Sequence, residues 1–256
     1  MMDLLKYLKK STNMKSTQIF GLRAIIEAIE AGKAVDKVFL QKGLRGALFT
    51  ELETLLRKEG ISSSYVPVER LNRFSQKNHQ GAIAQISPVD FHDLDALTIS
   101  IFEKGETPLF IILDQVTDVR NFGAIIRTAA CTGVHGIIIS KQGSAPINGD
   151  TVKTSAGGVF TVPICKVDHI KDAIYYLQSS GIEVFAASEK TDNTIFDVNL
   201  DKPVAVIMGS EGKGVSSGIL KIVDHKAKLP MQGSISSLNV SVACGAILYE
   251  IVRQRS

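Results

Sequence analysis

The polar side chains best suited to chemistry lie in three segments of the sequence. The first is residues 113–127, where Asn121 and Arg127 follow the apolar run LFIIL and are six residues apart. Six residues span about 600° of helix, so the two side chains would not share a face of one regular helix. If Asn121 instead lies at the mouth of the helix, both can reach one cleft. The alternatives are a helix cap for Asn121 and a surface ion pair for Arg127.

The second segment is a glycine-rich turn, IMGSEGKGVS, at residues 207–216. Its glycines, Gly209, Gly212 and Gly214, allow tight turns and let a ligand approach backbone N–H groups closely. Glu211 in the middle of the turn argues against a phosphate cradle. Neither GxGxxG nor GxxxxGK[ST] occurs in this part of the chain, which disfavours a nucleotide-binding oxidoreductase.

The third segment is LPMQGSISSLNVSVACGAILYEIV, residues 229–252. The pattern predicts a short strand that breaks at Pro230, then a polar loop, then an apolar helix from Val240. Ser237 and Asn239 lie at the helix entrance, where residues of these types cap free N–H groups. Gly245 inside the helix suggests a close packing neighbour. The alternative is an ordinary loop and C-terminal helix.

Strands and helices alternate from residue 107 onward, which predicts a doubly wound α/β domain with a parallel sheet. The uninterrupted apolar strand at residues 109–113 is typical of a sheet covered on both faces. Ligands of such sheets bind beyond the carboxyl ends of the strands. The segments that directly follow strands are therefore the expected binding and catalytic segments.

The rest of the chain predicts three further parts. Residues 1–16 form a flexible basic arm, and residues 17–88 form a smaller α/β unit. Residues 89–106 form a linker with one short helix, so that the larger domain occupies residues 107–256. In the smaller unit, Leu22, Ile25, Ile26 and Ile29 share one helical face.

Composition indicates a folded protein of the reducing cytoplasm. The chain has 256 residues, 45% of them hydrophobic, and a net charge of +3, which by itself does not imply a nucleic-acid partner. Cys131, Cys165 and Cys244 lie far apart, so no pair has metal-ligand spacing and no metal is expected. The sequence has no apolar run approaching 18 residues and no signal-peptide core, so no membrane association is expected.

Together, the three segments resemble the SpoU (TrmH-like) family of S-adenosylmethionine-dependent RNA ribose 2′-O-methyltransferases. The motifs are N-x5-R, then G-x-E-G-x-G, then LP-x5-SSLNVS, and the resemblance runs from residue 108 to 253. The segments IFGLRAIIEAI and HQGAIA resemble the ribosomal-protein-like RNA-binding domain of members that methylate a guanosine of 23S rRNA.

The resemblance implies a fold and partners that the residue pattern alone does not. The larger domain would be a SPOUT domain, whose C-terminal stretch threads into a trefoil knot, although chain connections normally exclude knots. S-adenosylmethionine would lie in the knot, held mainly by backbone groups around Gly209, Leu229 and Leu238. Members are homodimers with active sites near the subunit interface, so RNA and a second copy of the chain are the expected partners.

The resemblance also assigns roles to five residues: Asn121, Arg127, Glu211, Ser237 and Asn239. Arg127 would bind the phosphate beside the reacting ribose and take part in a phosphate-coupled base role, because a free guanidinium has too high a pKa to act alone. Glu211 would orient Arg127. The remaining three would position the hydroxyl or the cofactor.

Two alternatives to rRNA methylation stay open. One is a tRNA substrate for the same chemistry, and the other is a non-catalytic RNA-binding or ribosome-assembly protein on the same fold. The complete set of five site residues argues against the second. In the smaller unit, His79 either touches RNA or makes a structural hydrogen bond. Phosphate contacts could come from its basic residues: Arg23, Lys42, Arg45, Arg70, Arg73 and Lys77.

Overall fold

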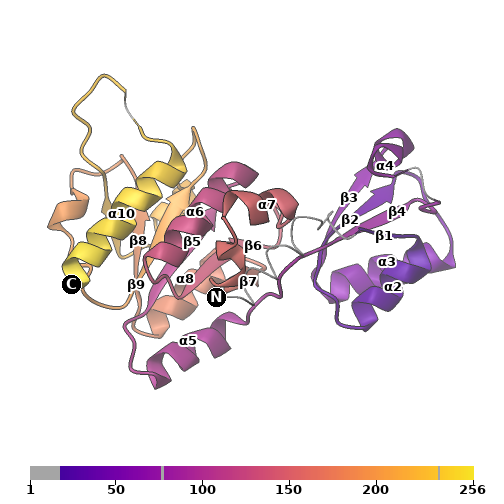
Figure 1. Ribbon diagram of the computed structural model, residues 1–256, viewed down its shortest axis with the longest axis horizontal. Helices are drawn as coiled ribbons and strands as arrows, with labels where there is room; N and C mark the ends of the chain where they lie inside the picture. Colours follow the sequence, from indigo (N-terminus) through magenta and orange to yellow (C-terminus); the bar gives the residue numbers. More distant parts are fainter. Residues whose placement is uncertain (1–17, 76–77, 236) are drawn as a thin grey trace. The chain divides into compact units, whose positions relative to one another are not determined.

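The computed structural model describes residues 18–75, 78–235 and 237–256. The predicted N-terminal arm, Lys77 and Ser236 lie outside the described residues. The chain divides into two compact units, with the main boundary between Asp90 and Phe91 (Figure 1).

The larger unit is built on a six-stranded sheet in which every pair of neighbouring strands is parallel. The strand order is β10-β8-β9-β5-β6-β7. All residues of β5 and β9 are buried, which confirms the strand predicted from LFIIL and the doubly wound fold. The strands are β5 (Leu109–Asp114), β6 (Gly136–Ser140), β7 (Ile164–Val167), β8 (Glu183–Ala187), β9 (Val204–Gly209) and β10 (His225–Ala227).

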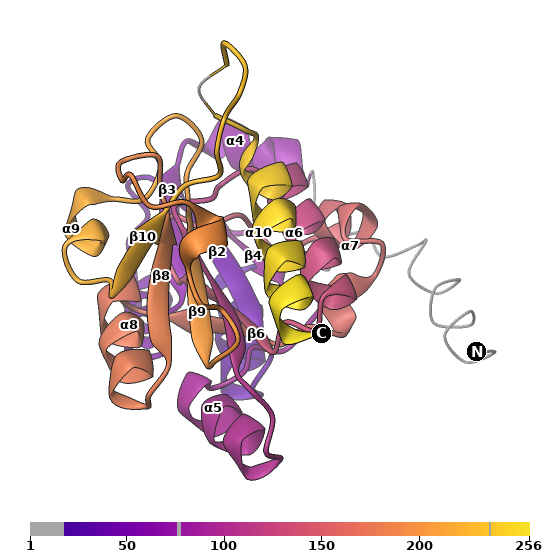
Figure 2. The ribbon, with the colours of Figure 1, turned by 90° about the vertical axis from the view of Figure 1, so that its left-hand side faces the viewer.

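Helices cover both faces of this sheet (Figure 2). One face packs against α5 (Leu94–Glu103), α8 (Ile170–Ser179) and α9 (Ser217–Leu220). The other side carries α6 (Val119–Cys131), α7 (Gly149–Thr154) and α10 (Val240–Arg255), with α10 packed along α6. Two 3-10 turns lie among the described residues, at Gly158–Phe160 and Ile195–Asp197.

The stretch predicted as a linker contains α5. Asp93 caps this helix, because its carboxylate accepts a hydrogen bond of 2.9 Å from the backbone N–H of Ala96. Leu94 and Ile101 are buried in the same core cluster as Phe110 of β5. The helix is therefore packed as part of the larger unit.

The smaller unit has a four-stranded sheet with the order β1-β4-β2-β3. Strand β4 is antiparallel to β1 and β2, and β3 is parallel to β2. The strands are β1 (Gln18–Phe20), β2 (Val35–Gln41), β3 (Ser62–Val66) and β4 (Ala82–Ile86), and the helices are α2 (Leu22–Glu30), α3 (Ala47–Lys58) and α4 (Val68–Phe74).

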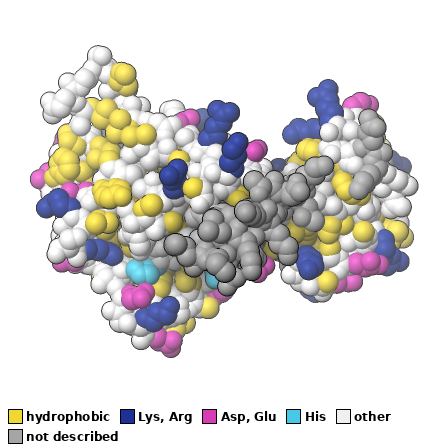
Figure 3. Space-filling view, viewed as in Figure 1, with side chains coloured by type: hydrophobic (Ala, Val, Ile, Leu, Met, Phe, Trp, Pro, Cys, Tyr) yellow, Lys and Arg dark blue, Asp and Glu magenta, His cyan; other side chains and the backbone are white. Residues whose placement is uncertain are grey.

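The core of the smaller unit follows the predicted helical periodicity. The buried residues of α2 include all four predicted positions, Leu22, Ile25, Ile26 and Ile29. Strand β3 ends at Val66, because Pro67 has no N–H for the sheet and α4 begins directly after it. Figure 3 shows that dark blue Lys and Arg side chains gather at the end of this unit that carries α4.

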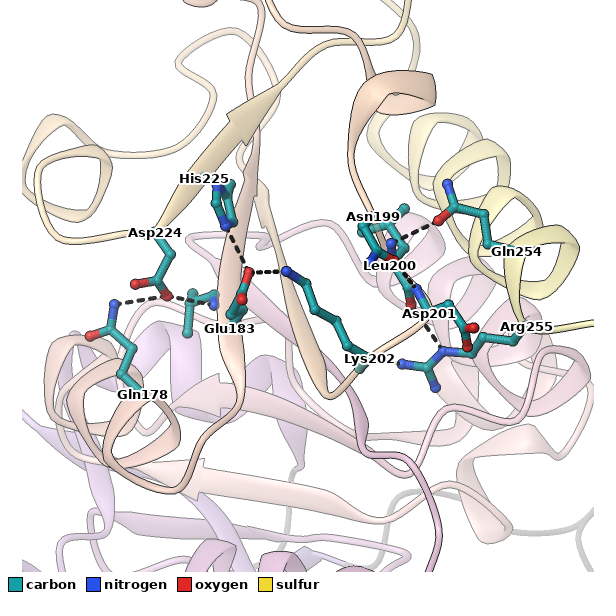
Figure 4. Close-up of polar contacts among 11 residues, drawn as sticks. Gln178, Glu183, Asn199, Leu200, Asp201, Lys202, Asp224, His225, Gln254 and Arg255 are labelled. Atoms are coloured by element: carbon teal, nitrogen blue, oxygen red, sulfur yellow. Dashed lines mark hydrogen bonds and ion pairs between the residues drawn. The ribbon is translucent and has the colours of Figure 1, made fainter.

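A network of polar contacts lies at the amino ends of β8, β9 and β10 (Figure 4). The Glu183 carboxylate lies 2.6 Å from Lys202 Nζ and 2.7 Å from His225 Nε2. The hydrogen bond from Lys202, followed by that from His225, lowers the pKa of Glu183. Arg255 donates hydrogen bonds to the carbonyl oxygens of Leu200 and Lys202 at 3.2 and 2.6 Å. These hydrogen bonds fix the C-terminal end of α10 to the segment that precedes β9.

Candidate active site

The carboxyl ends of β5 and β9 lie side by side, with Asp114 paired with Gly209. The backbone N–H of Ser216 donates a 2.7 Å hydrogen bond to the Asp114 carboxylate, which ties the loop after β9 to the end of β5. This buried aspartate was not among the predicted site residues, although its position at the very end of an apolar strand is a signal that the sequence contains.

Gly209 stands where no side chain fits. A Cβ atom there would lie 2.0 Å from the carbonyl carbon of Gly214, because the turn after β9 folds back onto the strand end. The turn is closed by a 2.9 Å hydrogen bond from the Gly214 N–H to the Ser210 carbonyl. Gly212 and Gly214 have positive φ angles of 81° and 67°, as tight turns require.

Three of the predicted residues meet at this edge, one from each segment. Glu211 Oε1 accepts hydrogen bonds from Asn121 Nδ2 at 2.9 Å and from Asn239 Nδ2 at 2.7 Å. Asn239 Nδ2 also lies 3.0 Å from Asn121 Oδ1. Residues separated by up to 118 positions in the sequence therefore form one hydrogen-bonded cluster.

The helix caps explain how the two amides are placed. Asp118, not Asn121, caps α6, accepting hydrogen bonds from the N–H groups of Arg120 and Asn121 at 2.8 and 2.9 Å. The Asn121 side chain is thus left for Glu211. The signal for this cap was an aspartate directly before the helical pattern.

Asn239 has two functions in the cluster. Its Oδ1 caps α10, as its residue type predicted, by accepting a hydrogen bond of 2.9 Å from the N–H of Ser241. Its Nδ2 points the other way, toward Glu211 and Asn121. The start of α10 is therefore coupled directly to the site.

Arg127 and Ser237 do not join this cluster. Asn121 lies inside the first turn of α6, so Arg127 is about 120° away from it around the helix axis. Both Arg127 and Ser237 are exposed, and neither side chain makes a hydrogen bond or ion pair with another described residue. Glu211, expected to orient Arg127, instead accepts from the two amides within this chain.

The loop between β10 and α10 has the properties of a ligand-binding segment. Among residues 229–235 and 237–238, no backbone–backbone hydrogen bond occurs. Leu229 is half-buried, whereas Met231, Ile235 and Leu238 expose much of their apolar side chains. Free amides beside apolar surface suit a nucleoside, so the residues present fit the adenosine part of S-adenosylmethionine.

Three further features of the described residues concern metal ligands, thiols and membrane-spanning helices. No group of three or more His, Cys, Asp or Glu side chains there is arranged to hold a metal ion. Burial raises the pKa of the Cys165 and Cys244 thiols to about 12, so both are protonated at neutral pH. No helix in the described part of the chain is long and apolar enough to span a membrane.

Comparison with known proteins gives matches over both units. The SpoU rRNA Methylase family matches residues 108–249, and a second profile, described as RNA 2′-O ribose methyltransferase substrate binding, matches residues 18–92. The Putative TrmH family tRNA/rRNA methyltransferase YacO of Bacillus subtilis is 33% identical over 93% of this chain and 96% of its own length.

Two solved structures are similar to this chain. The SpoU methyltransferase AviRb from Streptomyces viridochromogenes, solved in complex with the cofactor AdoMet, has a TM-score of 0.59 and 28% identity, covering 93% of this chain and 90% of that one. The TrmH/SpoU tRNA modifying enzyme of A. aeolicus has a TM-score of 0.54 and 34% identity, covering 63% of this chain and 82% of that one.

The fold and these matches define a two-unit RNA methyltransferase. The chain belongs to the SpoU rRNA methylase family. It is an RNA 2′-O-ribose methyltransferase, and its methyl donor is S-adenosylmethionine.

Proposed function

We propose that this enzyme methylates the ribose 2′-hydroxyl of a guanosine in 23S rRNA, in the cytoplasm. The smaller unit supports rRNA through the segments IFGLRAIIEAI and HQGAIA, which resemble those of members with that substrate. One observation supports the chemistry most directly. Asn121, Glu211 and Asn239 converge beside the loop between β10 and α10, in which residues 229–235 and 237–238 make no backbone–backbone hydrogen bonds. A tRNA substrate is the competing proposal, and the name of the Bacillus subtilis relative includes both RNAs.

The proposed division of labour follows from the contacts. Bound S-adenosylmethionine supplies an electrophilic methyl group, and backbone groups around Gly209, Leu229 and Leu238 hold it. The Asn121–Glu211–Asn239 cluster fixes the side chains that face the ribose, so that the hydroxyl is aligned before it reacts. Arg127 binds the neighbouring phosphate with its guanidinium fork, and Ser237 positions the hydroxyl.

The position of Arg127 supports a site shared between two copies of the chain. Within one chain, Arg127 and the cluster are on different sides of α6. Val242 and Tyr249 of α10 expose 55% and 58% of their side chains, and apolar side chains exposed on one helix mark an association surface. We infer a homodimer in which Arg127 of one copy completes the site of the other, with a trefoil knot holding the cofactor loop.

The test is incubation with radiolabelled S-adenosylmethionine and separate 23S rRNA and tRNA transcripts, followed by mapping of the modified ribose. We expect label in the rRNA transcript, at the 2′-oxygen of one guanosine. Label confined to tRNA would replace the rRNA proposal with its competitor. Confirmed cofactor binding without methyl transfer to either RNA would favour a non-catalytic RNA-binding or ribosome-assembly protein.

A further inference from the structure

Five cationic side chains of the smaller unit gather at one edge of its sheet. The register places the carboxyl ends of β1, β2 and β3 beside the amino end of β4. The three connections at this end, which follow β1, β2 and β3, carry the five cations: Arg23, Lys42, Arg45, Arg70 and Arg73. Residues far apart in the sequence thus form one surface, called here the basic edge.

The charge of the basic edge is not neutralised within the unit. All five side chains are exposed, and none makes an ion pair or side-chain hydrogen bond with another described residue. Glu69 is the only acid in the connecting segments of this edge. At the opposite edge acids and bases alternate, and Lys58 pairs with Glu59. The basic edge therefore carries mostly positive charge, whereas the opposite edge carries charges of both signs.

A rigid turn lies in the middle of the basic edge, at residues 78–81. The buried His79 accepts a 3.0 Å hydrogen bond at Nδ1 from the Gly81 N–H, so its Nε2 carries the proton and donates to Asn72 Oδ1 at 2.9 Å. His79 is thus structural, and it ties the turn to α4. The turn contacts the carboxyl end of β2, because the Gln41 N–H donates to the Gly81 carbonyl at 2.8 Å.

Gln80 at the tip of this turn has a strained backbone and an exposed side chain. Its φ is +49°, a conformation that costs a non-glycine residue free energy and persists where the surroundings impose it. Glycine would adopt this conformation without cost. An exposed amide that can both donate and accept hydrogen bonds therefore lies at a position where glycine would carry no backbone strain.

We propose that the basic edge is the surface on which the smaller unit docks the RNA substrate. The five cations bind successive phosphates, and the Gln80 amide contacts the edge of an unpaired base. The proposal rests on the proposed function in naming RNA as the partner, and it deepens that function by assigning one edge of the unit to it.

The first test measures binding of a 23S rRNA transcript by the full-length protein at several salt concentrations. The variant is Lys42→Gln combined with Arg70→Gln and Arg73→Gln, and the matched control is Lys33→Gln with Lys58→Gln at the other edge. Affinity falls as salt rises, so the slope of log affinity against log salt is negative. Each lost phosphate contact should make this slope shallower by about 0.7 to 0.9. KM should rise at unchanged kcat, because these contacts do not touch the reacting groups.

The second test uses Gln80→Gly, which removes the amide and the backbone strain together. We expect an unchanged or higher melting temperature and a raised KM, a combination that a purely structural role would not give. Edge variants with the control's slope and KM would overturn the docking surface. Wild-type protein that binds the transcript but transfers no methyl group would contradict the proposed function alone, since binding is read separately.

Discussion

At the scale of single residues, the site depends on one carboxylate oxygen shared by two amides. Glu211 Oε1 accepts from both Asn121 and Asn239, and each asparagine belongs to a different helix start. Removing the acceptor would leave the Asn121 amide donor without its partner and Asn239 with only its contact to Asn121 Oδ1. The same carboxylate is exposed enough to meet a cation from a second copy.

Glu211→Gln separates the shape of this residue from its charge. The glutamine oxygen can still accept from both amides, so we expect an unchanged melting temperature and unchanged cofactor affinity. We expect kcat to fall about 100-fold, because in the proposed homodimer Arg127 of the partner subunit would lose the charge that orients it, and a misplaced group costs that order of rate. Steady-state kinetics with the RNA substrate give the answer, and a kcat within twofold of wild type would exclude an electrostatic role.

At the scale of elements, α10 links the site to the segment that precedes β9 in the larger unit. Asn239 joins its start to Glu211, and Gln254 joins its end to the N–H of Leu200 at 2.7 Å. Gly245 does not need to be a glycine for packing on α6, since an added Cβ would contact Thr128 Cγ2 at an ordinary 3.8 Å. The contacts that fix α10 within the chain are thus polar ones at its two ends and apolar ones along its length.

Glu250, a buried residue of α10, makes part of this fixation depend on pH. It accepts hydrogen bonds from Arg253 and Gln254, which lower its pKa to about 2. The pKa is lowered on folding, so the stabilisation is complete above the unfolded pKa of about 4.3 and is lost as pH falls toward 2.

Glu250→Gln should therefore lower the free energy of unfolding at pH 7 by about 1 kcal/mol, a value discounted because Arg253 is largely exposed. It should also flatten the acid decline between about pH 4.5 and 2. Urea unfolding across this range measures both effects. The control is Glu103→Gln at an exposed position of α5. An acid decline as steep as in wild type would exclude Glu250 as its source.

At the scale of the whole molecule, the shared site can be tested by mixing two inactive variants. Arg127→Ala and Asn239→Ala should each fold normally and lose turnover. Arg127→Ala should also keep its affinity for the cofactor. If Arg127 acts on its partner's site, a co-refolded mixture forms mixed dimers with one intact site each and recovers about a quarter of wild-type activity.

The control mixture pairs Asn239→Ala with Glu211→Ala, whose residues lie in one cluster of the same chain. No mixed dimer of that pair contains an intact site, so activity should stay absent. Absence of recovery in the Arg127 mixture as well, with mixed dimers present, would place Arg127 in its own chain's site.

The sequence by itself determined the fold class, the three segments and the family resemblance. Apolar periodicity and uninterrupted buried runs such as residues 109–113 are local properties, so they predict strands, helices and a parallel sheet directly. The family motifs, which are also local patterns of the sequence, singled out five residues as site candidates: Asn121, Arg127, Glu211, Ser237 and Asn239.

Only the tertiary structure decided which side chains meet. Helix rotation separates Arg127 from Asn121, a hydrogen bond across 102 residues ties Asp114 to Ser216, and sheet register gathers the cations of the basic edge. Such contacts depend on strand order and on where each helix begins. A shift of one residue at a helix start turns every side chain along the helix by about 100°.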